Sequence, residues 1–131
     1  MDSKAPAQQT VTVEELNQII WNHLYERDWH NNPSRGLAIS LALEANELLE
    51  HYQWNDKPVG GPEAVGEELA DVFIYGMQIA QQNNIDIVHH IKRKLEKAAR
   101  KYPAEDFKNK TPDEVRAAWL KNKLAHKKEG L

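Results

Sequence analysis

Four acidic residues stand in two pairs of equal spacing, and these pairs are the strongest chemical signal in the sequence. Glu44 and Glu47 form the first pair, and Glu68 and Asp71 form the second. Residues three apart in an α-helix share one face, so each pair can direct two carboxylates at one point. If the two helices pack side by side, four carboxylates converge and their mutual repulsion requires a cation. Hard oxygen ligands favour Mg²⁺ or Mn²⁺.

The residues around the acids favour a Mg²⁺ or Mn²⁺ site over two alternatives. A di-iron carboxylate site uses Glu-x-x-His on two helices, and no glutamate here is followed by histidine three positions later. His51 stands four residues after Glu47 and could reach the rim of the site, although a surface histidine is the simpler interpretation. The second alternative is a set of solvated acids on a helix surface. Apolar residues around both pairs argue against it, namely Leu43, Leu48, Leu49, Leu69, Val72 and Phe73.

Apolar residues at helical spacing predict four core helices that would position these acids. Joined by short loops, the helices are expected at residues 13–28, 35–52, 62–83 and 87–102. Thr12 and Glu15 have the capping-box pattern, and Ser34 and Asp86 are expected to cap the second and fourth helices. Pro62 suits the first turn of the third helix. Since no stretch alternates as a strand does, the predicted fold is all-α, an antiparallel four-helix bundle.

Both ends of the chain are predicted to lie outside this bundle. Residues 1–11 are expected to form a flexible tail, and residues 12–103 the helical domain that carries the acids. The stretch Thr111–Glu114 combines a cap, a proline at the first helical position and a carboxylate at the third. An extra C-terminal amphipathic helix is therefore predicted within an extension over residues 104–131.

Composition limits the classes of partner. The 131 residues carry a net charge of −3, with a pI near 6.1. A nucleic-acid polymer is not an expected partner, because dedicated binders have a strongly basic domain or face. The chain has no cysteine, which excludes disulfides and thiolate metal sites. No apolar signal-peptide core and no membrane span are visible, so we expect a cytoplasmic protein without a membrane partner.

The order of these motifs resembles that of the all-α nucleoside triphosphate pyrophosphohydrolases, which include the MazG-like proteins and the dCTP and dUTP pyrophosphatases. Glu44-x-x-Glu47, twenty residues, and then Glu68-x-x-Asp71 is similar to the ExxE…ExxD signature of this superfamily. Further stretches agree in order and spacing over residues 16–103. These are Glu26–Trp29, Tyr52–Trp54, and Lys94 ahead of Lys101–Pro103.

The resemblance implies Mg²⁺-dependent hydrolysis of a nucleoside triphosphate to the monophosphate and pyrophosphate, with Mn²⁺ as a substitute. It implies a MazG-like catalytic domain over residues 12–103 that assembles as a homodimer or homotetramer. The four acids Glu44, Glu47, Glu68 and Asp71 fall on the metal positions of the family. Glu47, or alternatively Glu44, is expected to orient or deprotonate the attacking water.

The substrate contacts follow from the same resemblance and from charge. Trp29 and Trp54 fall where dCTP pyrophosphatase-like members place aromatics around the base, and Tyr75 and Lys94 fall near the phosphates. Two arginines are added as candidate phosphate contacts because they are cationic. Of these, Arg35 lies in the first turn of the second helix, where free amides also favour anions, and the other is Arg100.

The base and the class of function stay open at this point. The segment 30–36, which leads from Trp29 into the second helix, is one residue shorter than in dCTP pyrophosphatase-like members. A dCTP-like substrate and a role in cleaning the nucleotide pool are favoured, while dUTP, dATP, a damaged nucleotide or a signal such as ppGpp are alternatives. From another class, the alternative is a non-catalytic helical interaction module whose acids form a structural metal site or an acidic binding face.

Overall fold

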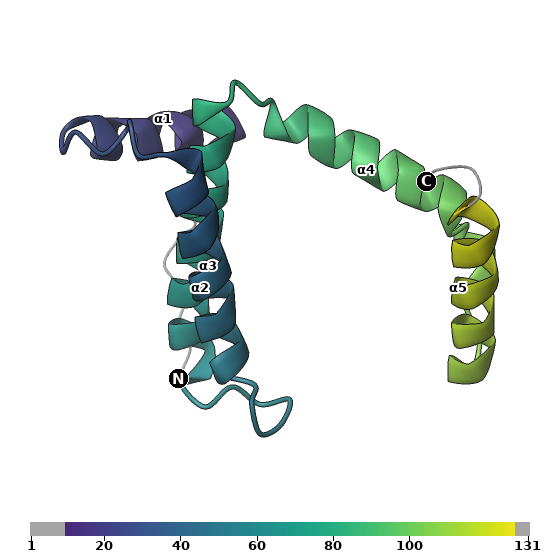
Figure 1. The fold of residues 1–131 in the computed structure, drawn as a ribbon. Helices are drawn as coiled ribbons and strands as arrows, with labels where there is room; N and C mark the ends of the chain where they lie inside the picture. The colour runs from purple at the N-terminus through teal and green to yellow at the C-terminus, as the bar shows by residue number, and fades with distance from the viewer. Residues whose placement is uncertain (1–9, 128–131) are drawn as a thin grey trace. The chain divides into compact units, whose positions relative to one another are not determined.

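The computed structural model describes residues 10–127, and these residues form helices without any strand. Five of the elements are α-helices and one is a short 3₁₀ helix. In chain order they are α1 (Val13–Tyr25), α2 (Ser34–Glu50), α3 (Gly61–Gln82), α4 (Ile87–Lys101), η1 (Ala104–Asp106) and α5 (Pro112–Lys127) (Figure 1). The all-α prediction, including the extra C-terminal helix, is confirmed. Most of the predicted N-terminal tail lies outside the described residues.

The helix starts agree with the sequence prediction to within one residue, and the caps predicted for α1 and α4 form as expected. The Thr12 hydroxyl accepts a hydrogen bond from the Glu15 backbone N–H at 3.1 Å at the start of α1. The Asp86 carboxylate accepts from the His89 backbone N–H at 3.1 Å at the start of α4. These bonds satisfy amides that have no partner inside a helix. Nowhere in residues 10–127 is a helix long and apolar enough to cross a membrane.

The first helix is shorter than predicted. It ends at Tyr25 instead of Asp28, and Asp28 adopts a left-handed conformation with a φ of 54°. The backbone N–H of Trp29 then donates to the carbonyl of Leu24 at 2.9 Å. This is the hydrogen bond that closes a helix followed by a left-handed residue. The prediction counted Arg27 at helical spacing after the last apolar residue, Leu24, but the helix ends two residues before Arg27.

The cap predicted at Ser34 is wrong. Pro33 occupies the capping position in an extended conformation, and Ser34 is the first helical residue of α2. The Ser34 hydroxyl instead donates to the side-chain oxygen of Gln82 on α3 at 3.1 Å. A residue predicted to start one helix therefore links two helices.

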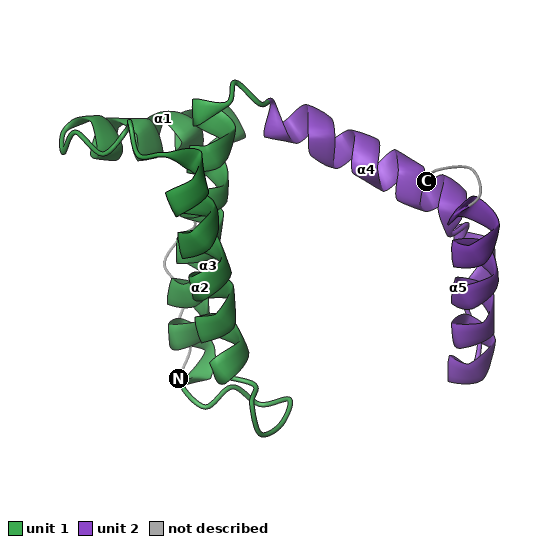
Figure 2. Cartoon of the chain, in the orientation of Figure 1, with its two compact units in different colours: residues 1–85 green, residues 86–131 purple. Residues whose placement is uncertain are grey.

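The chain divides into two compact units, residues 1–85 and residues 86–131, and each is described by itself (Figure 2). In the first unit α2 and α3 lie side by side as an antiparallel pair, and α1 packs on the C-terminal part of α3 (Figure 1). In the second unit α4 packs on α5, and the side chain of Asn122 donates to the Asp106 carboxylate at 3.1 Å. The packing of all four core helices in one bundle stays a prediction.

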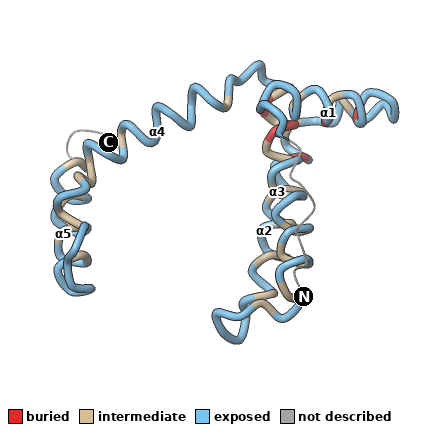
Figure 3. The backbone as a smooth tube through the Cα atoms, turned by 180° about the vertical axis from the view of Figure 1, so that it is seen from behind, coloured by how far each residue is buried: buried red, intermediate tan, exposed pale blue. Residues whose placement is uncertain are grey.

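Few apolar side chains are buried in the described chain, and they gather where α1 meets the α2–α3 pair (Figure 3). They are Ile20, Leu24, Leu37, Met77 and Ala80. The helices of the second unit bury no residue fully. The structure of the first unit is therefore packed at one end, which leaves the opposite end of the α2–α3 pair free of a dense core.

Three glutamines of α3 attach α1 and the loop after it. Gln78, 2 % exposed, donates from its side chain to the backbone carbonyl of Trp29 at 3.2 Å. Gln81 donates to the carbonyl of Asn17 at 2.8 Å, and Gln82 donates to two further carbonyls of the loop. Buried carbonyl groups lose free energy when they have no donor. These amides therefore fix the loop that carries Trp29.

Replacing Gln78 should destabilise the protein measurably. Gln78→Ala leaves the carbonyl of Trp29 without its donor, so the free energy of unfolding should fall by about 1–3 kcal/mol. Gln18→Ala, on the exposed face of α1, should change it by less than about 0.5 kcal/mol. Urea denaturation followed by circular dichroism measures both changes. Equal midpoints for the two variants would contradict the role given to this amide.

Candidate metal centre

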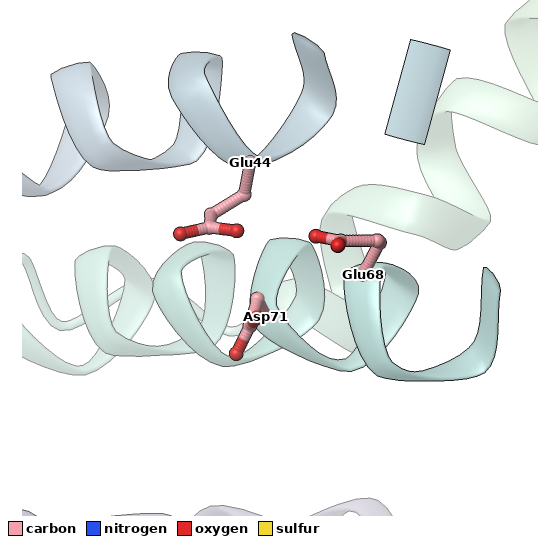
Figure 4. A group of neighbouring side chains, drawn as sticks. All are labelled: Glu44, Glu68 and Asp71. Carbon is pink, nitrogen blue, oxygen red and sulfur yellow. The ribbon is translucent and has the colours of Figure 1, made fainter. Parts of the chain in front are cut away.

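Acids from α2 and α3 meet between the two antiparallel helices (Figure 4), where Glu44 and Glu68 are half-buried and Asp71 is exposed. Glu44 on α2 and Glu68 and Asp71 on α3 each place a carboxylate oxygen within 4.8 Å of the other two. Glu44 reaches from α2 toward α3, and its carboxylate faces that of Glu68 in Figure 4. The three-residue spacing of Glu68 and Asp71 puts both on one face of α3. Three of the four acids predicted from the sequence thus form one group, called here the acid group.

Glu47 lies beside the acid group and acts on it electrostatically. Burial, followed by a hydrogen bond to Glu47 and repulsion from it, raises the pKa of Glu44 to about 7. Burial and the same contacts with Glu47 also raise the pKa of Glu68, while the nearby His51 opposes that rise. The charged form of each acid is disfavoured because neighbouring carboxylates repel it in a place with little water. A positive charge at this position would remove that penalty.

Two oxygens of the acid group lack a hydrogen-bond partner among the described residues. They are Oε2 of Glu44 and Oε2 of Glu68, and both are buried. Buried polar atoms are nearly always paired, since an unpaired one loses free energy. Several hard oxygen donors that repel each other and have unpaired atoms are the donor set that Mg²⁺ or Mn²⁺ binds. The residues present therefore fit a divalent cation.

A cavity of about 430 Å³ opens beside the acid group. Its volume lies within the range of small-molecule sites. The wall includes the ring of Trp54, which is 78 % exposed. The residues that line the cavity are Glu47, Glu50, His51, Trp54, Val59, Gly60 and Glu68. Carboxylates that can hold a cation thus adjoin a space with an open aromatic face.

A model of the MazG-like family matches residues 39–112, which is more than half of the 131-residue chain and includes all four acids. The chain belongs to the MazG-like family. The match begins in α2 and ends at the start of α5, so the family core includes parts of both compact units. The acids and the loop between them are therefore features of the MazG-like portion of the chain.

Individual proteins similar to this MazG-like chain include dCTP pyrophosphatases. The chain is 31 % identical over 102 residues to dCTP pyrophosphatase 1 of Homo sapiens, which covers 71 % of this chain and 60 % of that protein. It is 30 % identical over 101 residues to dCTP pyrophosphatase 1 of Bos taurus, covering 70 % and 60 %. The chain spans about three fifths of the length of these curated relatives.

A solved structure is also similar. A pyrophosphatase from Archaeoglobus fulgidus superposes with a TM-score of 0.63 at 32 % sequence identity. The superposition covers 76 % of this chain and 99 % of the archaeal chain. The likeness supports the all-α fold and extends over nearly the whole length of the archaeal chain.

The other predicted substrate residues of the first unit lie at different distances from the acid group. Tyr75 is half-buried on α3, one turn beyond Asp71. Arg35 is the second residue of α2, nine positions before Glu44, which corresponds to about 14 Å along the helix axis. Trp29 precedes α2, so it also lies toward that far end. The structure therefore brings Trp54 to the acid group within one chain, and it does not bring Arg35 or Trp29 there.

The two remaining predicted phosphate contacts belong to the second unit. Lys94 and Arg100 are both exposed on α4 (Ile87–Lys101). Since each unit is described by itself, their role at the phosphates stays a prediction.

The preferred sequence interpretation of His51 as a surface residue is wrong, and the alternative that it reaches the rim of the site agrees with the structure. Its side chain is only 17 % exposed, and its Nε2 lies 3.9 Å from Oε1 of Glu68. The available signal was its position, one helical turn after Glu47 at the end of α2, ahead of a loop with two adjacent glycines. That signal shows proximity to the acids, but the contact with Glu68 depends on how the loop folds back.

The raised pKa of Glu44 predicts that the metal-free protein loses stability as the pH rises. Above the ordinary carboxyl pKa of 4.5 the unfolded chain has released this proton, whereas the folded chain keeps it until about pH 7. The folded state binds more protons in that window, so the free energy of unfolding falls as the pH rises through it. Glu44→Gln should make the thermal midpoint in EDTA depend less on pH over this window.

The matched control is Glu67→Gln, an exposed acid on the same helix as Glu68. Its carboxylate is exposed and outside the acid group, so this variant should retain the pH dependence of the wild-type protein. The same thermal scans measure both variants. An equally steep decline in the Glu44→Gln protein would contradict the electrostatic description of the acid group.

Proposed function

We propose that this protein is a Mg²⁺-dependent nucleoside triphosphate pyrophosphohydrolase that cuts a (deoxy)nucleoside triphosphate into the monophosphate and pyrophosphate. The observation that carries the proposal is the acid group of Glu44, Glu68 and Asp71, with two buried oxygens unpaired, beside a cavity with an exposed tryptophan. The names of similar proteins, dCTP pyrophosphatase 1 and a pyrophosphatase, support the same class of reaction. We further propose a role in cleaning the cytoplasmic nucleotide pool.

The four acids Glu44, Glu47, Glu68 and Asp71 would hold the cation. When bound, Mg²⁺ or its substitute Mn²⁺ neutralises phosphate charge and lowers the pKa of a bound water. The acids in turn keep the triphosphate at one end of the α2–α3 pair, since they bind it only through the cation. Without that charge the carboxylates would repel the substrate.

Glu47 is the candidate for the residue that orients and deprotonates the attacking water. It is exposed and lines the cavity, whereas Glu44 and Glu68 are half-buried. The water oxygen forms a bond to the α-phosphorus while the bond from that phosphorus to the bridging oxygen breaks. The proton passes to the carboxylate and pyrophosphate leaves. Glu44, with a pKa of about 7, is the alternative acceptor near neutral pH.

The ring of Trp54 is the proposed contact for the base. An aromatic side chain that is 78 % exposed on a cavity wall can stack on a nucleobase and lose that exposure. A dCTP-like base is favoured by the names of the relatives. The other proposed substrate contacts are Tyr75, Lys94 and Arg100. Trp29 and Arg35 stay predictions from the sequence, because the single chain leaves them away from the acid group.

We propose that the chain self-associates as a homodimer or homotetramer. Large apolar side chains on α2 and α3 are open to solvent, including Phe73 at 65 %, Leu49 at 63 % and Leu43 at 57 % exposure. Exposed apolar surface of this kind is stabilised when a partner covers it. No nucleic-acid polymer and no membrane are proposed as partners.

Sedimentation equilibrium tests the self-association. The account predicts a mass of two or four times the 15.1 kDa chain. A single-chain mass over the whole micromolar concentration range would contradict it.

Pyrophosphate release from a panel of nucleotides tests the proposed activity. With Mg²⁺, the protein should release pyrophosphate from dCTP faster than from dUTP, dATP or ppGpp, and EDTA should stop the release because the acids then hold no cation. Preference for another triphosphate would show that the proposed base is wrong and would still support the proposed reaction. No release from any member of the panel would contradict the proposed enzymatic activity and favour the non-catalytic interaction module.

A charge-removing change at the acid group should abolish that release. Glu68→Gln removes one carboxylate while keeping the shape, and Mg²⁺-dependent turnover should fall by about 100-fold or more. Glu67→Gln, the exposed neighbour, should retain turnover. Circular dichroism checks that both variants keep the helical fold. Unchanged turnover by the Glu68→Gln protein would remove the acid group from the reaction.

Removing the ring of Trp54 should weaken nucleotide binding. Stacking of a base on an aromatic side chain contributes about 1–3 kcal/mol, so Trp54→Ala should raise KM about tenfold. Trp54→Phe keeps an aromatic face and should raise KM less. Steady-state kinetics on the preferred nucleotide measure both, and an unchanged KM for the alanine variant would exclude stacking at this position.

A further inference from the structure

His51 occupies the point where the end of α2 meets the start of α3. It directly follows Glu50, the last residue of α2. Its carbonyl oxygen accepts a hydrogen bond from the backbone N–H of Val59 at 2.9 Å, and its ring Nδ1 accepts from the backbone N–H of Gly60 at 3.3 Å. One residue therefore closes the loop 51–60 with both its backbone and its side chain.

The bond from Gly60 determines which ring nitrogen carries the proton. Nδ1 of His51 accepts a hydrogen, so the proton of the neutral ring lies on Nε2. Nε2 lies 3.9 Å from Oε1 of Glu68, and the two side chains are 17 % and 22 % exposed. Oε2 of Glu68 is the buried oxygen without a partner. The ring thus faces one oxygen of this carboxylate, and the other oxygen stays available to a ligand.

A glycine at position 60 makes room for the ring. A Cβ atom on Gly60 would lie 2.7 Å from Cε1 of His51 and 2.8 Å from Cβ of Ala64. Its φ of −88° is open to any residue, so the backbone does not require glycine. The close approach of the His51 imidazole explains why a glycine stands at position 60. The loop and the ring therefore form one fitted unit beside Glu68.

We propose that His51 is a positioning residue for the cation site: it orients the Glu68 carboxylate so that Oε2 serves a divalent cation. This inference rests on the proposed function, since that cation is the one used in hydrolysis. His51 is a basic side chain that the structure places against the acids. The 3.9 Å contact of Nε2 with Glu68 is electrostatic and is not a hydrogen bond. Loss of a polar neighbour that orients a metal-binding carboxylate weakens metal binding by about 10–100-fold.

Two substitutions separate the two contacts of the ring. His51→Asn keeps an amide oxygen near the position of Nδ1, so it retains the bond from Gly60 and loses the group that faces Glu68. His51→Gln keeps an N–H near the position of Nε2 and loses the bond from Gly60. His51→Leu removes both contacts. His90→Gln, at an exposed histidine of α4, is the matched control.

Mn²⁺ binding without nucleotide, followed by electron paramagnetic resonance, is the decisive measurement. The asparagine and leucine variants should bind Mn²⁺ about tenfold more weakly than the wild-type protein. The glutamine variant and the control should bind it with wild-type affinity. In turnover, the Mg²⁺ concentration needed for half-maximal rate should rise for the asparagine variant, while saturating Mg²⁺ restores kcat.

Stability in EDTA should follow a different order, because it depends on the loop contact. Urea unfolding should leave the asparagine variant close to wild type and weaken the glutamine and leucine variants. Mn²⁺ affinities that follow this stability order would overturn the positioning role, since His51 would then only hold the loop. A fall in kcat with unchanged Mn²⁺ affinity would overturn it in favour of a direct substrate contact.

The wild-type protein separates failure of this inference from failure of the proposed function. If it binds Mn²⁺ and releases pyrophosphate while the asparagine and leucine variants bind Mn²⁺ equally well, the positioning role alone is overturned. If it binds Mn²⁺ with the predicted order of variants and releases no pyrophosphate, the proposed function fails and the positioning role stands. A wild-type protein that binds no Mn²⁺ overturns both.

Discussion

Repulsion between carboxylates held between two helices is the constraint on which the rest of this structure depends. Glu44, Glu68 and Asp71 converge to within 4.8 Å from α2 and α3, and Glu47 adds a further charge beside them. Such a group persists only if it binds protons or a cation. The raised pKa of Glu44 and Glu68 describes the first solution. The buried oxygens without a hydrogen-bond partner are available to bind a cation, which is the second solution.

The two ends of the α2–α3 pair serve different purposes. At one end α1, a small apolar core and the glutamine amides of α3 hold the helices together. At the other end the acid group pushes them apart, and the loop closed by His51 holds them in place. Because the stabilising contacts lie away from the acids, no packed core fills the space beside them. That space is the cavity lined by Trp54. Separation of the packed end from the charged end is what permits a binding site in so small a unit.

Local patterns predicted much of this arrangement, because they depend on neighbouring residues. Thr12 and Asp86 cap their helices as their spacing indicates, and the three-residue spacing of Glu68 and Asp71 places both on one face. Prediction was weaker where distant segments interact. Ser34 bonds to Gln82 instead of capping α2, and His51 turns toward Glu68 because the loop folds back over a glycine. Helical periodicity contains no information on such contacts.

The central claim is that the acid group holds the divalent cation used to cut a nucleotide. The most direct measurement is anomalous X-ray diffraction from crystals of the protein soaked with Mn²⁺. The account predicts an anomalous peak in contact with carboxylate oxygens of Glu44, Glu68 and Asp71, and no such peak in the Glu68→Gln variant. A peak elsewhere with none at the acid group, or an unaltered peak in the variant, would contradict the account.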